Sequence, residues 1–332
     1  MPTAATPRVA AIIPHWNRRD LLPTLFQSLR EQTRPFDDIL VVDNGSTDES
    51  AAFAEAQGVR VLRLGVNTGF APAVNRGIQA VQADWVAILN NDVTLQPEWL
   101  ERLLENATRA GAHFATGKIL NTANPALIDG TFDALSRGAC ADRCGHGKAD
   151  GPIWNEPRSI QFAPLTAALF SADLFEELGG LDESFGSYME DAEFGLRCAI
   201  AGREGVYVPS AIAYHRGSAT LGAWNKATVW RIARNQVLLA AKHMRAQPLW
   251  PIVAGQLLWG CVAVRHGRGF AWLSGKFAGL REARGIQQVT TSAERRNRLA
   301  AVLRASEENI AALSRQTRPD TYWRAYFWLS PQ

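Results

Sequence analysis

Short apolar runs alternate with amphipathic segments along the first third of the chain. Such runs are typical of buried strands, and they lie at residues 9–13, 39–42, 59–64 and 85–89. Apolar side chains at helical spacing lie between them, over residues 21–32, 46–57 and 71–81. Ser46 followed by Glu49 is a capping-box pattern, which predicts that the second helix starts at Ser46. The alternation predicts an α/β fold with a Rossmann-like, mostly parallel sheet flanked by helices.

A polar residue follows each predicted strand. In chain order these residues are Asn17, Asp43, Asn67 and Asp92. The carboxyl ends of parallel strands meet at one edge, where open α/β sheets bind ligands, so we expect these side chains to share a crevice. No Gly-x-Gly-x-x-Gly follows the first strand and the chain has no P-loop sequence, which disfavours dinucleotide-binding and P-loop folds.

The fourth strand delivers Asn90, Asn91 and Asp92 to this edge. A carboxylate flanked by amides suits a hard divalent cation that also holds a phosphate. A turn with an Asn-Asp helix cap before Pro97 explains the same residues, and both interpretations stay open at this point.

The middle of the chain is less regular. We expect helices over 99–107, 173–178 and 190–201, and two strands over 205–209 and 211–214. Glu190 and Asp191 open the last of these helices, and His215 ends the second strand. Residues 118–157 contain scattered Gly and Asp and are not assigned. Zinc is a further hypothesis for Cys140, Cys144 and His146, although their spacing fits no strong template and no fourth ligand is apparent.

The composition is that of a globular protein, with 332 residues of which 47% are hydrophobic. Four cysteines are too few to staple a fold of this size, and the first residues lack a signal-peptide hydrophobic stretch, so cytosolic residence is expected. The net charge of +3 is uneven. Residues 242–332 hold 14 Lys and Arg against 5 Asp and Glu, or +9, which leaves −6 for residues 1–241.

The basic end predicts a separate helical region over 241–332, after a domain over 1–240. Residues 249–264 as a helix would reach about 24 Å, short of a hydrocarbon core of about 30 Å, so we expect a packed or interfacial segment. Helices from 228 and over 293–313 and an aromatic tail over 322–328 complete the region. Trp and Tyr beside Arg indicate peripheral contact with the inner face of the plasma membrane. Packing against the first domain, or in a homodimer, explains the same residues. Nucleic-acid binding is disfavoured because no known module is recognised.

A series of spaced motifs runs through residues 8–240. The motifs are Ile12-Ile13-Pro14 with Asn17, Val41-Val42-Asp43-Asn44-Gly45-Ser46-Thr47-Asp48, Asn67-x-Gly69-Phe70-Ala71 with Asn75-x-Gly77, Leu89-Asn90-Asn91-Asp92, Glu190-Asp191 with Arg197, and His215. In this order they resemble the motifs of inverting family 2 glycosyltransferases, most of all the rhamnosyltransferase-like and galactofuranosyltransferase-like members. The resemblance implies a GT-A fold, a nucleotide-diphosphate-sugar donor of the dTDP or UDP type, and a divalent cation, Mn²⁺ or Mg²⁺.

The resemblance also implies which residues bind the donor: Pro14, Asn17, Asp43, Ser46, Asn67, Gly69, Phe70, Asn75, Asn90 and Asn91. Asp43 would accept a hydrogen bond from the ring N–H of uracil or thymine, because a buried carboxylate without a donor is costly. The alternative is an Asp that caps the Ser46 turn. Gly69 would let the backbone approach the diphosphate, although a loop without a ligand fits the 67–75 motif equally well.

Two residues resemble the family's metal ligands. Asp92 corresponds to the last acid of the Asp-x-Asp motif, and His215 to an additional ligand found in some members. Asn90 stands where that motif has its first acid, so the site loses a charge. An imidazole ligand suits Mn²⁺ better than Mg²⁺, whereas a structural histidine at a strand end is the alternative.

In the implied reaction an acceptor hydroxyl attacks the anomeric carbon while the nucleoside diphosphate leaves. Asp191 is the expected base, and Glu190 and Thr166 are expected to bind the acceptor. A helix N-terminus would weaken Asp191 as a base, whereas repulsion from Glu190 would oppose that effect. We expect rhamnose as the sugar, and a cell-surface polysaccharide or lipid-linked glycan as the acceptor. Two other functions stay open: a non-catalytic glycan or nucleotide-sugar binder, and a sugar nucleotidyltransferase, whose Gly-rich first loop this chain lacks.

Overall fold

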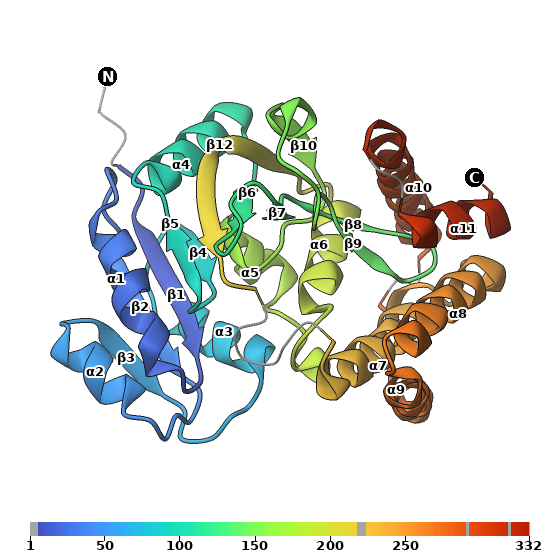
Figure 1. Cartoon of the computed structure of the whole chain (residues 1–332), viewed down its shortest axis with the longest axis horizontal. Helices are drawn as coiled ribbons and strands as arrows, with labels where there is room; N and C mark the ends of the chain where they lie inside the picture. The colour runs from blue at the N-terminus through green and yellow to red at the C-terminus, as the bar shows by residue number, and fades with distance from the viewer. Residues whose placement is uncertain (1–5, 218–223, 290–291, 318–319, 332) are drawn as a thin grey trace.

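The computed structural model describes residues 6–217, 224–289, 292–317 and 320–331. A central sheet carries helices on both faces, and the C-terminal helices gather at one side of the molecule (Figure 1). This architecture confirms the predicted fold class, a mostly parallel sheet flanked by helices with a helical C-terminal extension.

The strands of the main sheet follow the order β10-β12-β6-β11-β4-β1-β2-β3, with β5 on β12 and β7 on β6, while β8 and β9 form a separate pair. Strands β3, β2, β1 and β4 are parallel, as predicted, and β6 and β12 form a second parallel pair. Strand β11 runs antiparallel between β4 and β6. The bounds are β1 Val9–His15, β2 Asp38–Asp43, β3 Arg60–Arg63, β4 Trp85–Leu89, β5 Val93–Leu95, β6 Phe114–Asn121, β7 Ile128–Gly130, β8 Asp133–Leu135, β9 Ala141–Arg143, β10 Arg158–Ile160, β11 Ala167–Ser171 and β12 Gly205–His215.

Most helices lie within four residues of their predicted bounds, whereas the helix over Gly269–Glu282 was not predicted. No helix in the described part of the chain is both long enough and apolar enough to span a membrane. The α-helices are α1 Leu22–Arg30, α2 Ser50–Ala56, α3 Phe70–Gln79, α4 Trp99–Ala110, α5 Asp173–Leu178, α6 Glu190–Ile200, α7 Lys226–His243, α8 Leu249–Arg265, α9 Gly269–Glu282, α10 Ala293–Gln316 and α11 Thr321–Leu329. Short 3-10 turns are η1 Arg19–Leu21, η2 Pro152–Trp154, η3 Glu183–Phe185 and η4 Ala283–Gly285.

The sheet has an apolar layer on each face. Side chains alternate along a strand, so Val9, Ala11 and Ile13 of β1 pack in the layer formed with α1 and α4, while Ile12 packs in the layer that contains α3. Burial on both faces explains why the parallel strands are continuous apolar runs in the sequence.

Two predicted boundaries are wrong. Helix α2 starts at Ser50, not Ser46, because the Ser46 hydroxyl accepts the N–H of Asn17 and so does not cap the helix. The two strands expected over 205–209 and 211–214 are one strand, β12, whose pairing with β6 is interrupted between Val208 and Ile212. Pro209 lies within this interruption, where its missing N–H is tolerated.

The unassigned segment 118–157 is ordered. It contains part of β6 together with β7, β8, β9 and η2, and the buried Lys118 Nζ lies 2.7 Å from Asp150 Oδ1. Strands of three residues are too short for a periodic pattern, which is why the sequence did not predict them.

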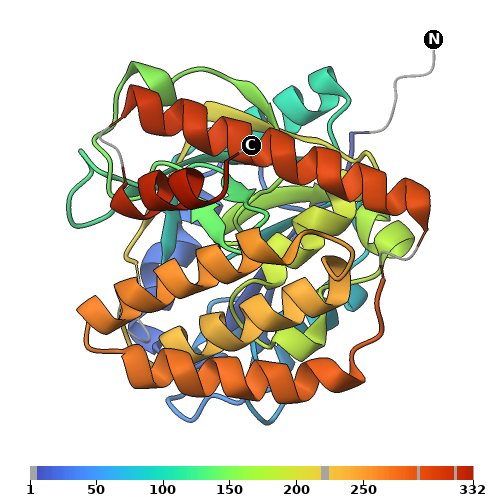
Figure 2. The ribbon, with the colours of Figure 1, turned by 90° about the vertical axis from the view of Figure 1, so that its right-hand side faces the viewer.

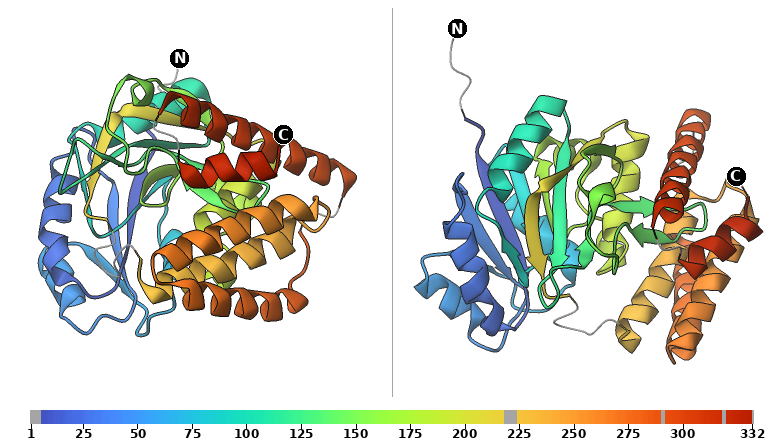
Figure 3. Two further views of the ribbon diagram at one scale, coloured as in Figure 1. Left: turned by 45° about the vertical axis from the view of Figure 1, so that its right-hand side comes forward. Right: turned by 45° about the horizontal axis from the view of Figure 1, so that its top comes forward.

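The C-terminal helices form a layer beside the sheet domain (Figures 2 and 3). Helix α9 packs closely on α7, since a Cβ at Gly275 would lie 2.4 Å from the Trp230 carbonyl oxygen. Helix α10 packs on α6 and β8, where Arg137 Nε lies 2.7 Å from the buried Glu307 Oε2. Helix α7 continues through residue 240, and the division at that residue stays a prediction.

Candidate active site

The carboxyl ends of β1, β2 and β4 form one polar edge. His15 lies opposite Asp43 in the β1–β2 register, and its Nδ1 is 2.9 Å from Asn91 Nδ2. Burial lowers the pKa of His15 to about 4, although the charges of Asp48, Asp43 and Asp20 act in the opposite direction, so the ring is neutral at pH 7. Its buried Nε2 has no hydrogen-bond partner within the described residues. No motif in the sequence marked His15 as a site residue.

Hydrogen bonds join Asn17 and Asp43 to Ser46. Asn17 has a left-handed φ of 54°, its N–H donates to Ser46 Oγ at 2.8 Å, and its Oδ1 accepts the Thr47 N–H at 2.8 Å. Asp43 is buried, and its Oδ1 accepts the Ser46 N–H at 3.1 Å, which matches the turn-capping alternative. Pro14 lies one residue inside this edge, in β1.

Asn44, which was not predicted as a site residue, organises the next loop. Its Oδ1 accepts the Thr68 N–H at 2.8 Å, and its Nδ2 donates to Asn67 Oδ1 at 3.2 Å and to the Gly69 carbonyl at 2.9 Å. Gly69 has a φ of 101°, and a Cβ there would lie 3.1 Å from the Gly186 carbonyl oxygen. Asn44 directly follows Asp43 in the sequence, and this adjacency is the signal that could have identified it.

Phe70 and Asn75 connect this loop to the segment before α6. The Phe70 N–H donates to Ser187 Oγ at 3.2 Å. The buried Asn75 donates to the Leu181 carbonyl at 2.9 Å and accepts the Leu181 N–H at 2.8 Å. The amide of Asn75 is thus used within the protein, and the loop-forming alternative explains it better than a donor contact does.

Asp92, His215 and Asp129 form a chain of contacts at the end of β12. His215 Nε2 lies 3.1 Å from Asp92 Oδ1, and His215 Nδ1 lies 2.8 Å from Asp129 Oδ2. Burial acts to lower the pKa of His215, but its bonds to the two carboxylates raise it to about 9. Asp129 comes from the unassigned segment 118–157. It was not predicted, because it is 86 residues away from His215 in the sequence and no local pattern links the two.

Asn90 and Thr166 lie at the same edge. The Asn90 N–H donates to the Thr166 carbonyl at 2.9 Å, and the Thr166 side chain is buried. The side chains of the predicted Asn90-Asn91-Asp92 motif therefore start from one turn between β4 and β5.

Arg143 lies between the Asp92–His215–Asp129 cluster and the acids of α6. Its Nη1 lies 3.7 Å from Asp129 Oδ2 and its Nε lies 3.9 Å from Asp133 Oδ1, and its charge also acts on Asp191. Burial raises the pKa of Asp133 to about 8, against the attraction of Arg143. Neither Arg143 nor Asp133 was predicted, since both belong to the unassigned segment.

The acid pair that opens α6 is withdrawn from water, with Glu190 buried and Asp191 half-buried. Burial raises the pKa of Asp191 above 3.8, while Arg143 and the Ala192 N–H oppose the shift. Burial and then repulsion from Asp191 raise the pKa of Glu190, whose Oε2 has no hydrogen-bond partner among the described residues. Desolvation outweighs the helix N-terminus here, which makes Asp191 a stronger base than its position at the start of a helix implies.

The backbone before α6 is strained and held in place. Tyr188 and Met189 have left-handed φ values of 72° and 71°, which non-glycine residues rarely adopt. Buried Asn235 of α7 donates its Nδ2 to the carbonyls of Phe185, Ser187 and Tyr188 at 2.9, 3.1 and 2.7 Å. Helix α7 therefore takes part in positioning Asp191.

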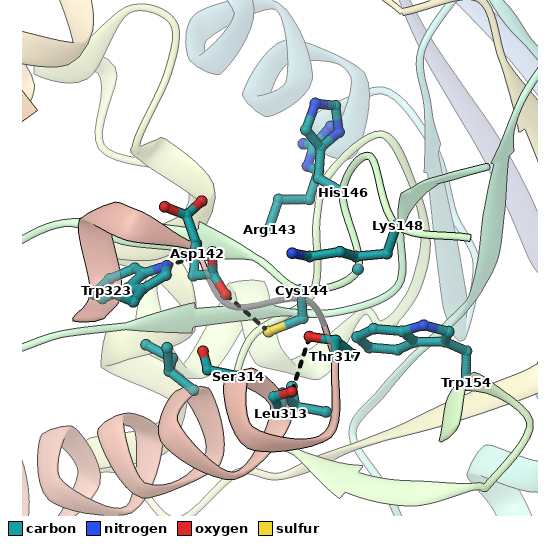
Figure 4. Close-up of a pocket in the computed structure, with 13 residues that line it drawn as sticks. Asp142, Arg143, Cys144, His146, Lys148, Trp154, Leu313, Ser314, Thr317 and Trp323 are labelled. Atoms are coloured by element: carbon teal, nitrogen blue, oxygen red, sulfur yellow. Dashed lines mark hydrogen bonds between the residues drawn. The ribbon is translucent and has the colours of Figure 1, made fainter. Parts of the chain in front are cut away.

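The zinc hypothesis is wrong. Within the described residues, no group of three or more His, Cys, Asp or Glu is arranged to hold a metal ion. Cys144 Sγ is directed at Asp142 Oδ2, 3.7 Å away, while His146 accompanies it in the lining of a cavity of about 170 Å³ and Cys140 does not (Figure 4). Burial raises the pKa of both thiols, which keeps them protonated and disfavours metal binding.

Two residues nevertheless fit a cation bound together with a substrate. Asp92 and His215 are ordinary ligand types for Mn²⁺, and Asp129 fixes the His215 ring with Nε2 facing Asp92, as carboxylates behind metal-binding histidines do. Because the pKa of His215 is raised, the cation would have to displace the proton on Nε2. A complete ligand set would need further oxygens, which a diphosphate can supply.

Known proteins resemble this chain in sequence. The family model for glycosyl transferase family 2 matches residues 10–126, and that for glycosyl transferase family group 2 matches residues 85–277. The chain is 30% identical over 213 residues to the N-acetylglucosaminyl-diphospho-decaprenol L-rhamnosyltransferase of Mycobacterium tuberculosis, covering 55% of this chain and 67% of the relative. It is 27% identical over 291 residues to the pre-mycofactocin glycosyltransferase of the same species, covering 86% of this chain and 58% of the relative.

Solved structures agree on the fold. A mannosyltransferase of Pyrobaculum calidifontis in complex with GDP-Man and Mn²⁺ has a TM-score of 0.53 at 17% identity, over 96% of this chain and 86% of that one. GalNAc-T7 with UDP, GalNAc and Mn²⁺ has a TM-score of 0.60 at 14% identity, over 85% of this chain and 56% of that one. The matches in sequence, together with this fold and the polar edge at its strand ends, establish that the chain belongs to glycosyltransferase family 2.

Proposed function

We propose that this glycosyltransferase is an inverting enzyme that moves a sugar from a nucleotide-diphosphate donor to a hydroxyl of a glycan or lipid-linked acceptor. One observation carries the proposal: contacts run without a break from Asp92 through His215 and Asp129 to Arg143, whose charge acts on Asp191. A leaving-group site and a basic carboxylate thus belong to a single cluster.

Donor binding is assigned to the loops after β1, β2 and β3. Asn17, Ser46, Asn67 and Gly69 shape these loops, and Asp43 lies at their base with its Oδ1 on the Ser46 N–H. We propose that the nucleobase, uracil or thymine, lies against Asp43. The unpaired Nε2 of His15 supports this location, because a buried polar atom without a partner is costly unless a ligand satisfies it.

A divalent cation, Mn²⁺ or Mg²⁺, is assigned to Asp92 and His215, with Asn90 and Asn91 beside them. When bound there, it would neutralise the charge that develops on the leaving diphosphate. Asp129 keeps the His215 ring in place. The solved neighbours that contain Mn²⁺ are consistent with this assignment.

Asp191 is assigned the role of the catalytic base. Its carboxylate takes the proton of the acceptor hydroxyl, while the hydroxyl oxygen forms a bond to the anomeric carbon and the bond to the leaving phosphate oxygen breaks. Attack on the face opposite the leaving group inverts the anomeric configuration. Glu190 and Thr166 are assigned to the acceptor, and the buried, poorly paired Glu190 suits a hydrogen bond to an acceptor hydroxyl.

The sugar is proposed to be rhamnose, and the donor a dTDP or UDP sugar, because a relative is a rhamnosyltransferase. Peripheral contact at the inner face of the plasma membrane, from the cytoplasm, follows from the same proposal, since an acceptor on a lipid carrier lies in a membrane; a homodimer is compatible with it.

A thermal-shift panel tests the proposal. A cognate nucleotide sugar at about a hundred times its Kd should stabilise the chain by about 2.7 kcal/mol, and Mn²⁺ should increase this effect. Transfer from the same donor to an acceptor glycan should follow. Donor binding without turnover or hydrolysis would instead favour the non-catalytic binder that the Asn90 substitution suggests.

A further inference from the structure

Large apolar side chains are exposed chiefly on the C-terminal helices. Within the described residues they are exposed elsewhere only at Trp16 and Val66. On the C-terminal helices they are Leu249, Trp250, Leu257, Val264, Phe270, Leu273, Phe277, Leu280 and Trp328. Soluble monomers rarely leave so many apolar side chains together in water, so this surface needs an occupant.

Helix α9 presents its exposed residues as one stripe. Phe270, Leu273, Phe277 and Leu280 recur at intervals of three or four residues, which places them along one side of a helix, and Phe270 is 86% exposed. The other side carries the small residues that meet α7, such as Gly275. The stripe therefore faces largely away from the contact between α9 and α7.

Helix α8 repeats the pattern. Trp250, Leu257 and Val264 recur at intervals of seven residues, or about two turns, and are more than half exposed. A short turn at 266–268 connects α8 to α9, and the two helices contact each other. Both lie at the same side of the molecule as α7 (Figure 2).

Cations accompany these apolar residues. Between residues 249 and 285 the chain has four arginines, one lysine and a single acid, Glu282. The lysine, Lys276, is buried and bound to Gln236 and Gln256. Arg265, Arg281 and Arg284 are exposed beside the apolar residues.

We infer that the exposed stripes of α8 and α9, with these arginines, form a docking face for a bilayer that contains anionic lipids. Apolar side chains enter the interfacial region and arginines pair with lipid phosphates, which is the composition that interfacial helices need. A second copy of the chain is a poorer occupant, because a two-fold interface would bring the same arginines together and add like-charge repulsion.

The face is connected to the acid pair by one helix. Helix α9 packs on α7, and Asn235 of α7 holds the 185–188 backbone that leads into Glu190 and Asp191. Docking would therefore place the acid pair at a set height above the membrane. This last step rests on the proposed function, whereas docking itself does not.

The test is co-sedimentation of the full chain with vesicles of phosphatidylcholine, alone or with phosphatidylglycerol added. We expect binding to the mixed vesicles, weakened by high salt. Phe277→Ser with Leu280→Ser should weaken it by at least about tenfold, because two exposed anchors are lost. Val66→Ser, a similarly exposed apolar residue outside the face, is the matched control and should bind like the native chain. Circular dichroism checks that each variant is folded.

Absence of binding to mixed vesicles at low salt would overturn the inference. So would a dimer that Phe277→Ser with Leu280→Ser dissociates, since it would identify a second copy as the occupant. The two proposals fail separately: vesicle binding without donor turnover removes the transferase proposal alone, and transfer to a soluble acceptor without vesicle binding removes the docking face alone.

Discussion

At the scale of single residues, hydrogen bonding decides what each polar side chain of the crevice contributes. Asp129 binds Nδ1 of His215 and leaves Nε2 facing Asp92. The side-chain amide of Asn75, in contrast, is hydrogen-bonded to the backbone of Leu181. Two residues from quoted motifs, His215 and Asn75, thus have different roles: one faces the cluster and the other holds a loop.

Asp129→Asn tests the orientation of His215. An amide can present its N–H₂ to Nδ1, so the ring loses its preferred tautomer, and Mn²⁺ affinity or transfer should fall by about 10- to 100-fold. A Mn²⁺ titration in the presence of donor measures this. Asp84→Asn is the control: it changes a carboxylate that lies just before β4 and accepts the Arg8 N–H. This variant should keep the native Mn²⁺ affinity and transfer rate. Equal Mn²⁺ affinity in the Asp129→Asn and native chains would contradict the assignment.

Asp191→Asn tests the base. Transfer should fall by about 10²- to 10⁴-fold, because an amide cannot take the acceptor proton, while the donor-induced thermal shift should persist. Asp173→Asn changes an acid in the first turn of α5 and serves as the matched control. Near-normal turnover of Asp191→Asn would remove this residue from the role.

At the scale of elements, α7 acts as a support for the start of α6. Its Asn235 binds the carbonyl of the left-handed Tyr188, and the helix packs closely against Gly275 and Gly279 of α9. Strained backbone of this kind persists only where the surroundings hold it.

Asn235→Ala removes the donor for three buried or half-buried carbonyls. We expect a loss of about 1–3 kcal/mol in unfolding free energy, together with reduced turnover. Urea denaturation and a transfer assay measure the two effects. Asn225→Ala removes only the N-cap of the same helix, should cost about 1 kcal/mol, and should spare turnover. If both variants lost turnover equally, a specific role of Asn235 would be ruled out.

Gly275→Ala tests the contact between α7 and α9. The new methyl would lie 2.4 Å from the Trp230 carbonyl oxygen, so we expect a loss of about 1–3 kcal/mol despite the higher helix propensity of alanine. Gly285→Ala, with nothing within 4 Å of its added Cβ, is the control for thermal unfolding. A more stable Gly275→Ala chain would show that the helices can separate at little cost.

At the scale of the whole molecule, one buried carboxylate of α6 pairs with two basic side chains at the end of α7. Glu193 of α6 is fully buried, with its oxygens 2.9 Å from Arg197 Nε, 2.7 Å from Lys242 Nζ and 2.9 Å from His243 Nε2. Burial acts to raise its pKa, but His243, Arg197 and Lys242 lower it to about 2.

The sign of the pH effect follows from this shift. The pKa of Glu193 is lower in the folded chain than its ordinary value of 4.5, so its stabilisation is complete above that pH and is lost as the pH falls towards about 2. At neutral pH this shift contributes about 3 kcal/mol to the free energy of unfolding. Urea denaturation of the native chain and Glu193→Gln should show a difference that shrinks on acidification to about pH 3. A difference that stays constant with pH would contradict it.

Much of the fold was predictable from the sequence, because parallel strands buried on both faces and amphipathic helices have strong periodic signals. Helix α5 was predicted without error, and β4 and β1 within two residues. The 118–157 segment was not predictable, since strands of three residues carry no period, and with it Asp129, Asp133 and Arg143 were missed.

The sequence by itself determined the strand ends and the acid pair, since each depends on residues close together in the chain. Only the tertiary structure decided which of these side chains are free for a ligand. Hydrogen bonds between distant residues, such as Asp129 to His215 and Asn235 to the 185–188 backbone, depend on how the elements pack, and packing is not encoded in any local pattern. The exposed stripe of α9 is another such case, because a stripe that faces water and one that faces a core have the same spacing.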